Sequence, residues 1–541
     1  MINNMFNSFK RLFCVSLITG CIGLDSSTGQ AQLLADADRF QEIENCPSDP
    51  EIEVFFVKKI EVLGNSIFKS EIRSLTQPLE NQKITIEKLI CLRSAITELY
   101  VSRGYITSGA FLPNNQEITE GIVKIQVVEG EIERIEIQGL KRLKDYYIRS
   151  RLENVTRTPL NQQTLQNGLA LLQLDPLIKT IQAELTPGST DGKSVLLVNL
   201  EEAKALSVEV STDNYRPANI GSYEGTIALS HGNVLGWGDK FSGEYSITEG
   251  LNLYNLHYNV PINPMDGRIG LHYWNTDSKI TETLFNIFDI RNQTETLGVE
   301  YRQPIYRTLQ TEWTLGLNLD IRNNRSSLEG VSFCFSQPCI DGKTNLTVLR
   351  FSQEWLNRTS NQVLAARSQL NFGINAFDST VVNIEPNQEF FSWLGQFQFV
   401  NRFSNNWLLL GRFYAQIAGD PLPIIEQFSL GGIDTVRGYA QNEIVTDNAL
   451  LGSLELRIPL TQDPEVLQIT SFVEGGTGWN NLLPDPDPAT LGGIGLGLRW
   501  LVANGLTVRL DYGIPLVSVD NSGNSLQEQG FYFSVRYRKA F

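Results

Sequence analysis

The chain has 541 residues, a length that predicts several domains. Its 44 basic and 60 acidic residues give a formal charge of −16, and no stretch is dense in lysine and arginine, so nucleic-acid binding has no electrostatic basis. Beyond the N-terminal segment there is no run of roughly 18 apolar residues, which excludes a transmembrane helix and leaves a β-barrel as the way this chain could cross a membrane.

Residues 1–31 are predicted to be a secretory signal peptide. Lys10 and Arg11 precede the apolar run from Leu12 to Leu24, and Ala31 offers a small residue for cleavage. An alternative is a lipoprotein signal, because the residues before Cys21 loosely fit that cleavage site and Cys21 would then carry a lipid anchor. Either signal takes the mature chain out of the cytoplasm.

Four cysteines lie beyond the signal, an even number in an oxidising compartment: Cys46, Cys91, Cys334 and Cys339. Cys334 and Cys339 flank a turn that contains proline, so we expect them to form a local disulfide. A disulfide between Cys46 and Cys91 follows by elimination, and the alternative is two free, buried thiols.

Residues 32–53 are mostly polar and are predicted to be a linker or a short N-terminal helix. An internal repeat follows, because the strand-like segments Val57–Gly64 and Ile132–Gly139 have matching patterns and both end at glycine. Each is followed by helical patterning, over 84–103 and 160–174, and then by a further strand. The repeat predicts two β-α-α-β-β modules, over residues 54–130 and 131–204.

Residues 205–541 show no recurring helical pattern and alternate instead between apolar and polar positions. One such segment is 309–322, where apolar residues from Leu309 to Ile321 fill one face and every charge lies on the other. A transmembrane β-barrel gives this pattern, and so does a soluble β-sandwich. Tryptophan and tyrosine near strand ends, room for about 16 strands and a C-terminal strand that ends at Phe541 favour the barrel.

No catalytic or metal-binding constellation is found in the sequence. The three histidines, His231, His257 and His272, have no cysteine or carboxylate at ligand spacing and are interpreted as girdle or lumen residues, so no metal, no cofactor and no enzymatic activity are predicted. The segment Gly188–Ser194 is one residue too short for a phosphate loop and is interpreted as a hairpin turn. The glycines of 492–497 do not fit a dinucleotide-binding fingerprint.

Several segments resemble the two-partner secretion transporters of the ShlB/FhaC/HecB type. Tyr100–Pro113 followed by Glu120-Gly121 is similar to their POTRA domains, Asn233–Asp239 to an early barrel turn, and the loop Val436-Arg437-Gly438-Tyr439 to their arginine motif. The final Phe541 resembles the assembly signal of outer-membrane proteins. The resemblance covers the chain from about Val54 to Phe541.

The resemblance implies a β-rich membrane protein in the bacterial outer membrane, with two periplasmic α+β POTRA domains before a 16-stranded antiparallel transmembrane β-barrel. The implied function is export of an unfolded partner polypeptide to the cell surface, without nucleotide, by a monomer that contacts outer-membrane lipids and the barrel-assembly machinery. The alternative is a barrel-insertion or assembly factor of the same superfamily. Such factors usually have three or more POTRA repeats, whereas we count two here.

The resemblance also implies a site inside the barrel. A loop around residues 431–443 would turn inward, and Arg437 would pair with Glu474, which alternation places on one strand face with Phe472 and Gly476. Phe472 could add a cation–π contact. The family has aspartate where this chain has Glu474, and the alternative is that Glu474 is simply a polar lumen residue. The family also commonly has an N-terminal helix that plugs the pore, for which residues 32–53 are short.

Overall fold

The computed structural model describes residues 54–114, 116, 118–282, 285–519 and 525–541. The chain divides into two compact units, the first ending at Ala203 and the second running from Lys204 to Phe541. The predicted signal peptide (1–31), the linker (32–53) and Cys46 lie outside the described residues. Within the described part, no helix combines the length and apolar character needed to span a membrane.

The first unit contains the two predicted modules, one after the other. In the first module a sheet of order β2-β5-β4 and the pair β1-β3 pack with two helices. Its elements are β1 (Val54–Val57), β2 (Lys59–Leu63), α3 (Lys69–Thr76), the 3₁₀ helix η1 (Gln77–Leu79), β3 (Gln82–Thr85), α4 (Ile86–Ser102), β4 (Gly109–Phe111), the 3₁₀ turn η2 (Thr119–Gly121) and β5 (Ile122–Val128). Helix α4 buries Leu89, Leu92, Ile96 and Leu99, a spacing that places them on one helical face against the sheet.

The second module repeats this plan. Its elements are β6 (Glu131–Gln138), α5 (Asp145–Glu153), α6 (Gln162–Gln173), β7 (Ile178–Pro187) and β8 (Lys193–Glu202). The central strand β8 runs parallel to β6 and antiparallel to β7, which lies at the edge of the sheet. Residues 188–192, at the start of the segment that resembles a phosphate loop, connect β7 to β8 as a hairpin turn, with no helix after them.

A carboxylate at the end of the last strand stabilises each module. Glu129 accepts hydrogen bonds from the backbone of Ser66 and Ile67, at 2.7 and 3.3 Å, in the segment that follows β2. In the second module Glu202 accepts equivalent bonds from the backbone of Lys141 and Leu143, at 2.6 and 2.9 Å, in the segment that follows β6. The repeat seen in the sequence is thus also a repeat of hydrogen bonding.

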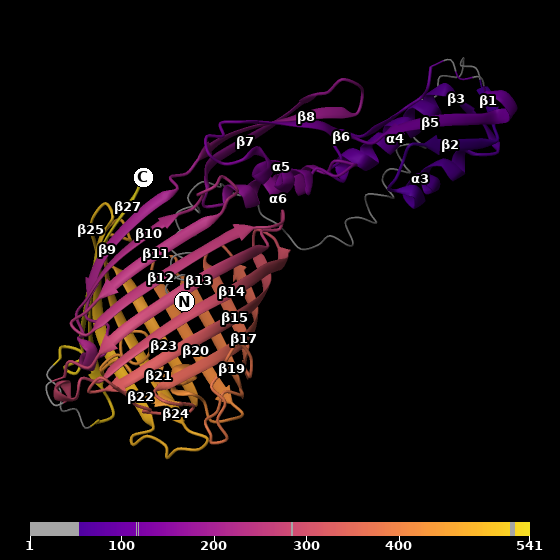
Figure 1. Ribbon diagram of the computed structural model, residues 1–541. Coiled ribbons are helices and arrows are strands. Elements are labelled where there is room, and N and C mark those ends of the chain that lie inside the picture. The colour runs from indigo at the N-terminus through magenta and orange to yellow at the C-terminus, as the bar shows by residue number, and fades with distance from the viewer. Residues whose placement is uncertain (1–53, 115, 117, 283–284, 520–524) are drawn as a thin grey trace. The chain divides into compact units, whose positions relative to one another are not determined.

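The second unit is a closed antiparallel β-barrel (Figure 1). Among the described residues its wall has sixteen strands, and the ring closes where β9 pairs with β27. The wall strands are β9 (Leu206–Asp213), β10 (Glu224–His231), β11 (Lys240–Ile247), β12 (Leu251–Pro261), β13 (Arg268–Lys279), β14 (Arg291–Arg307), β15 (Thr311–Leu328), β17 (Lys343–Arg358), β18 (Gln362–Ile374), β19 (Phe390–Arg402), β20 (Leu408–Ala418), β23 (Asn448–Pro459), β24 (Leu467–Trp479), β25 (Thr490–Ala503), β26 (Leu506–Pro515) and β27 (Phe531–Ala540). The two-residue strand β16 (Val331–Ser332) only extends the end of β15.

Connections at the two ends of the barrel differ in length, as in outer-membrane barrels. At one end tight turns such as 308–310, 359–361 and 504–505 join the strands. At the other end the connections are longer, for example 375–389, 419–447 and 516–530.

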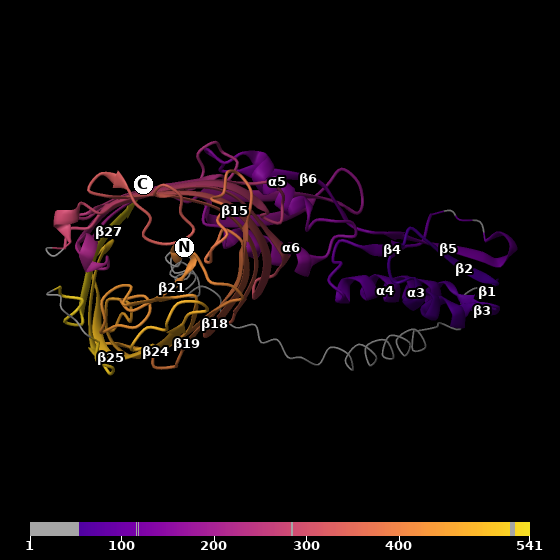
Figure 2. The same cartoon turned by 60° about the horizontal axis from the view of Figure 1, so that its bottom comes forward.

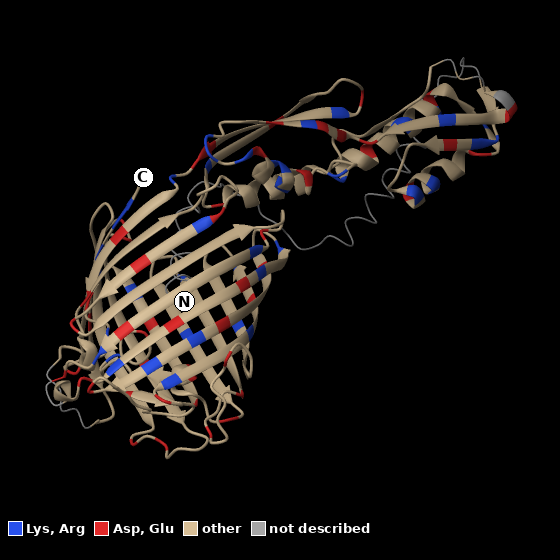
Figure 3. Cartoon of the chain, viewed as in Figure 1, with Lys and Arg blue, Asp and Glu red and all other residues tan. Residues whose placement is uncertain are grey.

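The alternating pattern of the sequence sorts side chains between the inside and the outside of the barrel. On β15, Trp313 and Leu317 are exposed on the outer face, whereas Thr314 and Asp320 are buried on the inner one. Charged residues are accordingly interspersed along the barrel strands and are not confined to the loops (Figure 3). The outer surface is therefore apolar and the lumen contains the ionic groups, which favours a lipid surround over a soluble sandwich.

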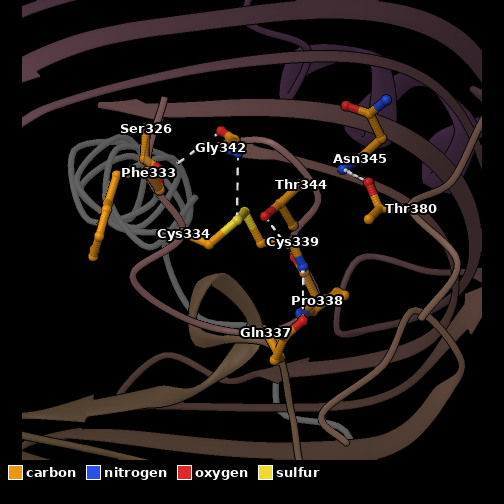
Figure 4. Close-up of a disulfide and its surroundings, with 10 residues drawn as sticks. All are labelled: Ser326, Phe333, Cys334, Gln337, Pro338, Cys339, Gly342, Thr344, Asn345 and Thr380. Atoms are coloured by element: carbon orange, nitrogen blue, oxygen red, sulfur yellow. Dashed lines mark hydrogen bonds between the residues drawn. A yellow bond between two sulfur atoms is a disulfide. The ribbon is translucent and has the colours of Figure 1, made fainter. Parts of the chain in front are cut away.

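The connection from β15 to β17 contains a disulfide between Cys334 and Cys339 (Figure 4). The backbone of Gly342 donates a hydrogen bond to Sγ of Cys334, and the hydroxyl of Thr344 donates one to the carbonyl of Pro338. The bridge therefore closes a compact loop.

The connection from β20 to β23, residues 419–447, folds into the barrel and is called the inward loop below. It contains the 3₁₀ helix η5 (Ile424–Glu426) and a two-stranded stem of β21 (Phe428–Leu430) and β22 (Ile444–Thr446). Residues 431–443 between the stem strands form the loop tip. In Figure 2 the label of β21 lies inside the ring of wall strands.

Candidate functional site

Arg437, at the loop tip, is enclosed by the barrel. Its side chain has 0% exposure and is the largest among the fully buried side chains of the described residues. Glu474 on β24 binds it on two sides, since one carboxylate oxygen accepts from Nη2 at 2.7 Å and the other accepts from Nε at 3.0 Å. That second oxygen also accepts from the backbone N–H of Arg437 at 2.9 Å. Glu474 therefore fixes both the guanidinium and the main chain of the tip.

Two further carboxylates complete the surroundings of Arg437. Its Nη1 lies 2.8 Å from Oδ1 of Asp511 on β26 and 2.9 Å from Oε2 of Glu455 on β23. Because all three acids are almost fully buried, these are charge-assisted contacts in a site with little water to screen them. Sequence reasoning missed Glu455 and Asp511, although Asp511 lies on the polar face of an alternating strand.

Wall arginines share these carboxylates. Arg412 contacts Glu474 at 3.1 Å, Arg457 contacts Glu455 at 2.7 Å, and Arg509 contacts Asp511. The carboxylates are thus held in place by the wall, and Arg437 is the group that the loop adds to a preformed ionic network.

Phe472 and Gly476 flank Glu474 on the same face of β24 and also meet the inward loop. The Phe472 ring stacks on the guanidinium of Arg437, with Cζ 3.4 Å from the ring centroid. A side chain at Gly476 would begin 2.8 Å from Cδ2 of Leu430 on the stem, so glycine there leaves the space that Leu430 fills. The three positions that alternation placed on one face therefore all face the loop.

The residues beside Arg437 are held by hydrogen bonds to the last barrel strands. The hydroxyl of Tyr532 on β27 accepts from the backbone of Gly438 at 2.9 Å and donates to the carbonyl of Tyr439 at 2.6 Å. The Tyr439 hydroxyl donates to the carbonyl of Gly492 at 2.8 Å. Val436 has 0% exposure and packs with Tyr439 in an apolar cluster, so the whole motif is buried.

Glycines in the wall let the tip approach the backbone. A Cβ at Gly493 on β25 would lie 2.1 Å from the carbonyl oxygen of Arg437, and one at Gly513 on β26 would lie 2.5 Å from the backbone nitrogen of Gly438. Gly438 itself has φ of +108°, which residues with a side chain rarely adopt. The glycine run of 492–497, which fits no nucleotide motif, thus contributes to the surface on which the tip rests.

The remaining predicted residues have structural surroundings but no demonstrated role. Phe541 follows β27 and donates its backbone N–H to the carbonyl of Leu206 at 2.8 Å, at the seam of the barrel. Its use as an assembly signal and the pairing of Cys91 with Cys46 stay predictions.

The histidines lie in barrel strands and two of them pair with carboxylates. Nε2 of His257 is 2.7 Å from Glu300, and Nε2 of His272 is 2.9 Å from Asp320. In the part of the chain that the structure describes, no three histidine, cysteine or acidic side chains are grouped so as to hold a metal ion.

Comparison with known proteins gives consistent matches along the chain. The family model of the haemolysin secretion/activation protein ShlB/FhaC/HecB matches residues 192–500, and that of the ShlB-type POTRA domain matches residues 55–130. The outer membrane transporter CdiB of Escherichia coli O6:K15:H31 (strain 536 / UPEC) is 26% identical over 491 residues, covering 86% of this chain and 80% of that protein.

A second relative and a solved structure agree with these matches. The heme/hemopexin transporter protein HuxB of Haemophilus influenzae (strain ATCC 51907 / DSM 11121 / KW20 / Rd) is 23% identical over 531 residues, covering 94% of this chain and 92% of that protein. The structure of CdiB from Escherichia coli has a TM-score of 0.68 at 22% identity and covers 98% of this chain and 99% of its own, which shows a common fold.

Proposed function

Because the chain belongs to the haemolysin secretion/activation protein family ShlB/FhaC/HecB, we propose that it exports an unfolded partner polypeptide from the periplasm to the cell surface. It is an outer-membrane transporter, with its barrel in the outer membrane and its POTRA domains in the periplasm. The observation that carries the mechanism is the burial of Arg437 among three carboxylates inside a closed barrel.

The inward loop closes the resting pore in this proposal. Its tip is bound to β23, β24 and β26 through Arg437 and to β27 through Tyr532, so a polypeptide that passes through the lumen must displace it. Displacement separates a guanidinium from buried carboxylates, which costs about 3 to 5 kcal/mol unless the partner supplies other contacts. The closed state is therefore stable without a partner and opens when one binds.

Recognition of the partner is assigned to the POTRA domains. In the described part of the second module β7 pairs with β8 on one side and lies at the sheet edge, which leaves main-chain donors and acceptors on its other side. An extended polypeptide can pair with such an edge through backbone hydrogen bonds, with little dependence on its sequence. This suits a partner that arrives unfolded.

The experiment that tests the function is reconstituted export in cells. The gene's neighbourhood is searched for a large secreted protein as the candidate partner. That protein is expressed in a host that lacks both genes, with and without the transporter, and surface-exposed partner is measured by protease accessibility in intact cells. We expect surface exposure only with the transporter. Partner that stays periplasmic in both strains, or insertion of unrelated barrels that depends on the transporter, would reject export and favour the assembly-factor alternative.

A further inference from the structure

The inward loop makes a second set of ionic contacts, remote from Arg437 and of opposite polarity. Glu426, at the end of η5, has a side chain only 4% exposed. Its Oε1 accepts from Nη1 of Arg322 on β15 at 2.7 Å and from Nη2 of Arg350 on β17 at 2.8 Å. At the tip the loop supplies a cation to an acidic wall, whereas here it supplies an anion to a basic wall.

The two sets of contacts lie on different parts of the barrel wall. Following the order of strands around the ring, β15 and β17, which hold Arg322 and Arg350, are four to eight strands away from β23, β24 and β26, which hold the carboxylates around Arg437. The segment from Glu426 to Arg437 is therefore fixed to the wall at two separate places.

The wall arginines are arranged to receive Glu426. Arg350 is oriented by Asp320, whose Oδ2 accepts from Nε at 3.0 Å, and by Asn371, whose Oδ1 accepts from Nη1 at 2.9 Å, so its Nη2 is directed at the loop. Among the described residues Glu426 is the carboxylate that forms an ion pair with Arg322, whose Nη1 also donates to the carbonyl of Ile425 at 3.3 Å. Without Glu426 two partly buried arginines face each other with one fewer negative charge between them.

The backbone at Glu426 is tied to the other end of the loop. Nε2 of Gln416 on β20 donates to the carbonyl of Glu426 and to that of Asp447, each at 3.1 Å. Through Gln416, the backbone at Glu426 is thus linked to Asp447, where the inward loop returns to the wall at β23.

We propose that Glu426 is a second positioning residue of the inward loop, which holds its stem on the β15–β17 wall independently of the hold that Arg437 has on the tip. This inference rests on the proposed role of the loop as the closure of the resting pore. Two independent holds mean that release of the tip alone leaves the stem in the lumen, and that full opening requires both ionic contacts to break.

The test uses the full-length purified protein carrying Thr446→Cys, a buried position on the stem, and measures the rate at which a maleimide labels it. Glu426→Gln removes the charge and keeps the size of the side chain. We expect the labelling rate to rise by at least about tenfold, because losing the two ion pairs of the buried Glu426 carboxylate raises the population of the released stem. Glu426→Asp, which keeps the charge, should restore part of the protection.

The matched control is Glu389→Gln, the same change at an exposed glutamate before β19, which should leave the labelling rate unchanged. Arg437→Ala should expose the stem less than Glu426→Gln does, and the double variant should exceed both. Barrel assembly is verified for every variant by its heat-dependent mobility in gels. Unchanged labelling in an assembled Glu426→Gln variant, or full exposure of the stem by Arg437→Ala alone, would overturn the second hold.

A conductance measurement separates this inference from the proposed function. In planar bilayers without any partner, Glu426→Gln should open more often than the wild type. The labelling and conductance assays need no exported polypeptide, so a failure of export in cells leaves their results intact. Conversely, if the Glu426→Gln variant showed wild-type labelling and wild-type conductance, the inference about Glu426 would be rejected, and the proposed export function would still stand.

Discussion

The carboxylate of Glu474 accepts five hydrogen bonds, three of them from Arg437. One oxygen binds both Nε and the backbone N–H of Arg437, and the other binds Nη2 of Arg437, Arg412 and the hydroxyl of Ser453. Both oxygens are thus saturated with donors. The glutamate that replaces the aspartate of the family pattern therefore engages the guanidinium with two oxygens and leaves no acceptor unused.

Replacement of Arg437 should abolish or strongly reduce secretion while the barrel still assembles. Arg437→Ala leaves three buried carboxylates without the cation of the loop, so the tip loses its defined seat while the stem stays in the lumen, where the misplaced loop obstructs the partner. Arg437→Lys keeps the charge but cannot bind three carboxylates with a planar fork, so it should fall between the wild type and alanine. Surface-exposed partner, measured by protease accessibility, gives the ranking, and normal secretion by Arg437→Ala would contradict it.

At the scale of single elements, strand β25 forms part of the barrel wall and also contacts the tip of the inward loop. A methyl group at Gly493 would overlap the carbonyl of Arg437, whereas Gly452 on β23 has no atom within 4 Å of the position of a Cβ. The two glycines are both in barrel strands and differ in what they face.

We therefore expect Gly493→Ala to displace the tip and raise the pore's open probability, and Gly452→Ala to have no effect on it. Single-channel recordings in planar bilayers compare the two variants with the wild type. Equal open probability in Gly493→Ala and Gly452→Ala would show that the close approach at Gly493 does not hold the tip.

The first POTRA module should lose stability in acid through Glu129. Burial alone would raise the pKa of Glu129, but the hydrogen bonds from Ser66 and Tyr100 lower that pKa below its ordinary value of 4.5. A carboxyl group with a lowered pKa stabilises the fold fully above about pH 4.5 and loses this contribution as the pH falls through its folded-state pKa. Glu129→Gln should destabilise the module near neutral pH, and its difference from the wild type should shrink as the pH drops below 4.5.

Pulse proteolysis of the full-length protein in urea, with the N-terminal module detected by antibody, measures this difference at each pH. A gap between wild type and Glu129→Gln that stays constant from neutral pH to well below 4.5 would contradict the assignment.

Much of the fold could be predicted from residue order because it depends on local periodicity. The repeat at Val57 and Ile132 marks the two modules, and alternation along 309–322 gives both the strand and its inner face. Alternation within one strand also placed Glu474 on one face with Phe472 and Gly476, whereas the lumen position of that face and its pairing with Arg437 were what the family resemblance implied.

The rest of the site depends on which strands are neighbours in the barrel and on the register in which they pair. Glu455 lies opposite Phe472, and Asp511 lies opposite Gly497, which itself pairs with Thr470. The registers of these neighbouring strands, not any spacing within one strand, bring both acids to the guanidinium that Glu474 binds. Glu426 precedes the arginine motif in a loop without a periodic pattern, and its partners Arg322 and Arg350 are far away in sequence. Such contacts form only when the ring of strands is closed, so no local pattern in the sequence indicates them.

At the scale of the whole molecule, transport should need no nucleotide. We propose that folding of the partner outside the cell drives export, and the segment at 188–194, which resembles a phosphate loop, includes the turn of an antiparallel hairpin. Purified transporter is placed in liposomes and given unfolded partner, with or without an ATP-degrading enzyme. The amount of partner that crosses the liposome membrane, measured by its protection from protease, should be the same in both samples. A requirement for added nucleotide would reject this driving force.

Strands at and beside the seam between β9 and β27 also contact the tip of the inward loop. Tyr532, which binds the backbone of the two residues that follow Arg437, belongs to the strand that closes the ring, and Asp511 belongs to the strand before it. A nascent barrel that has not yet incorporated its final strands offers the tip an incomplete binding surface. If the loop closes the pore as proposed, a stalled or truncated intermediate should leak and should not rest closed.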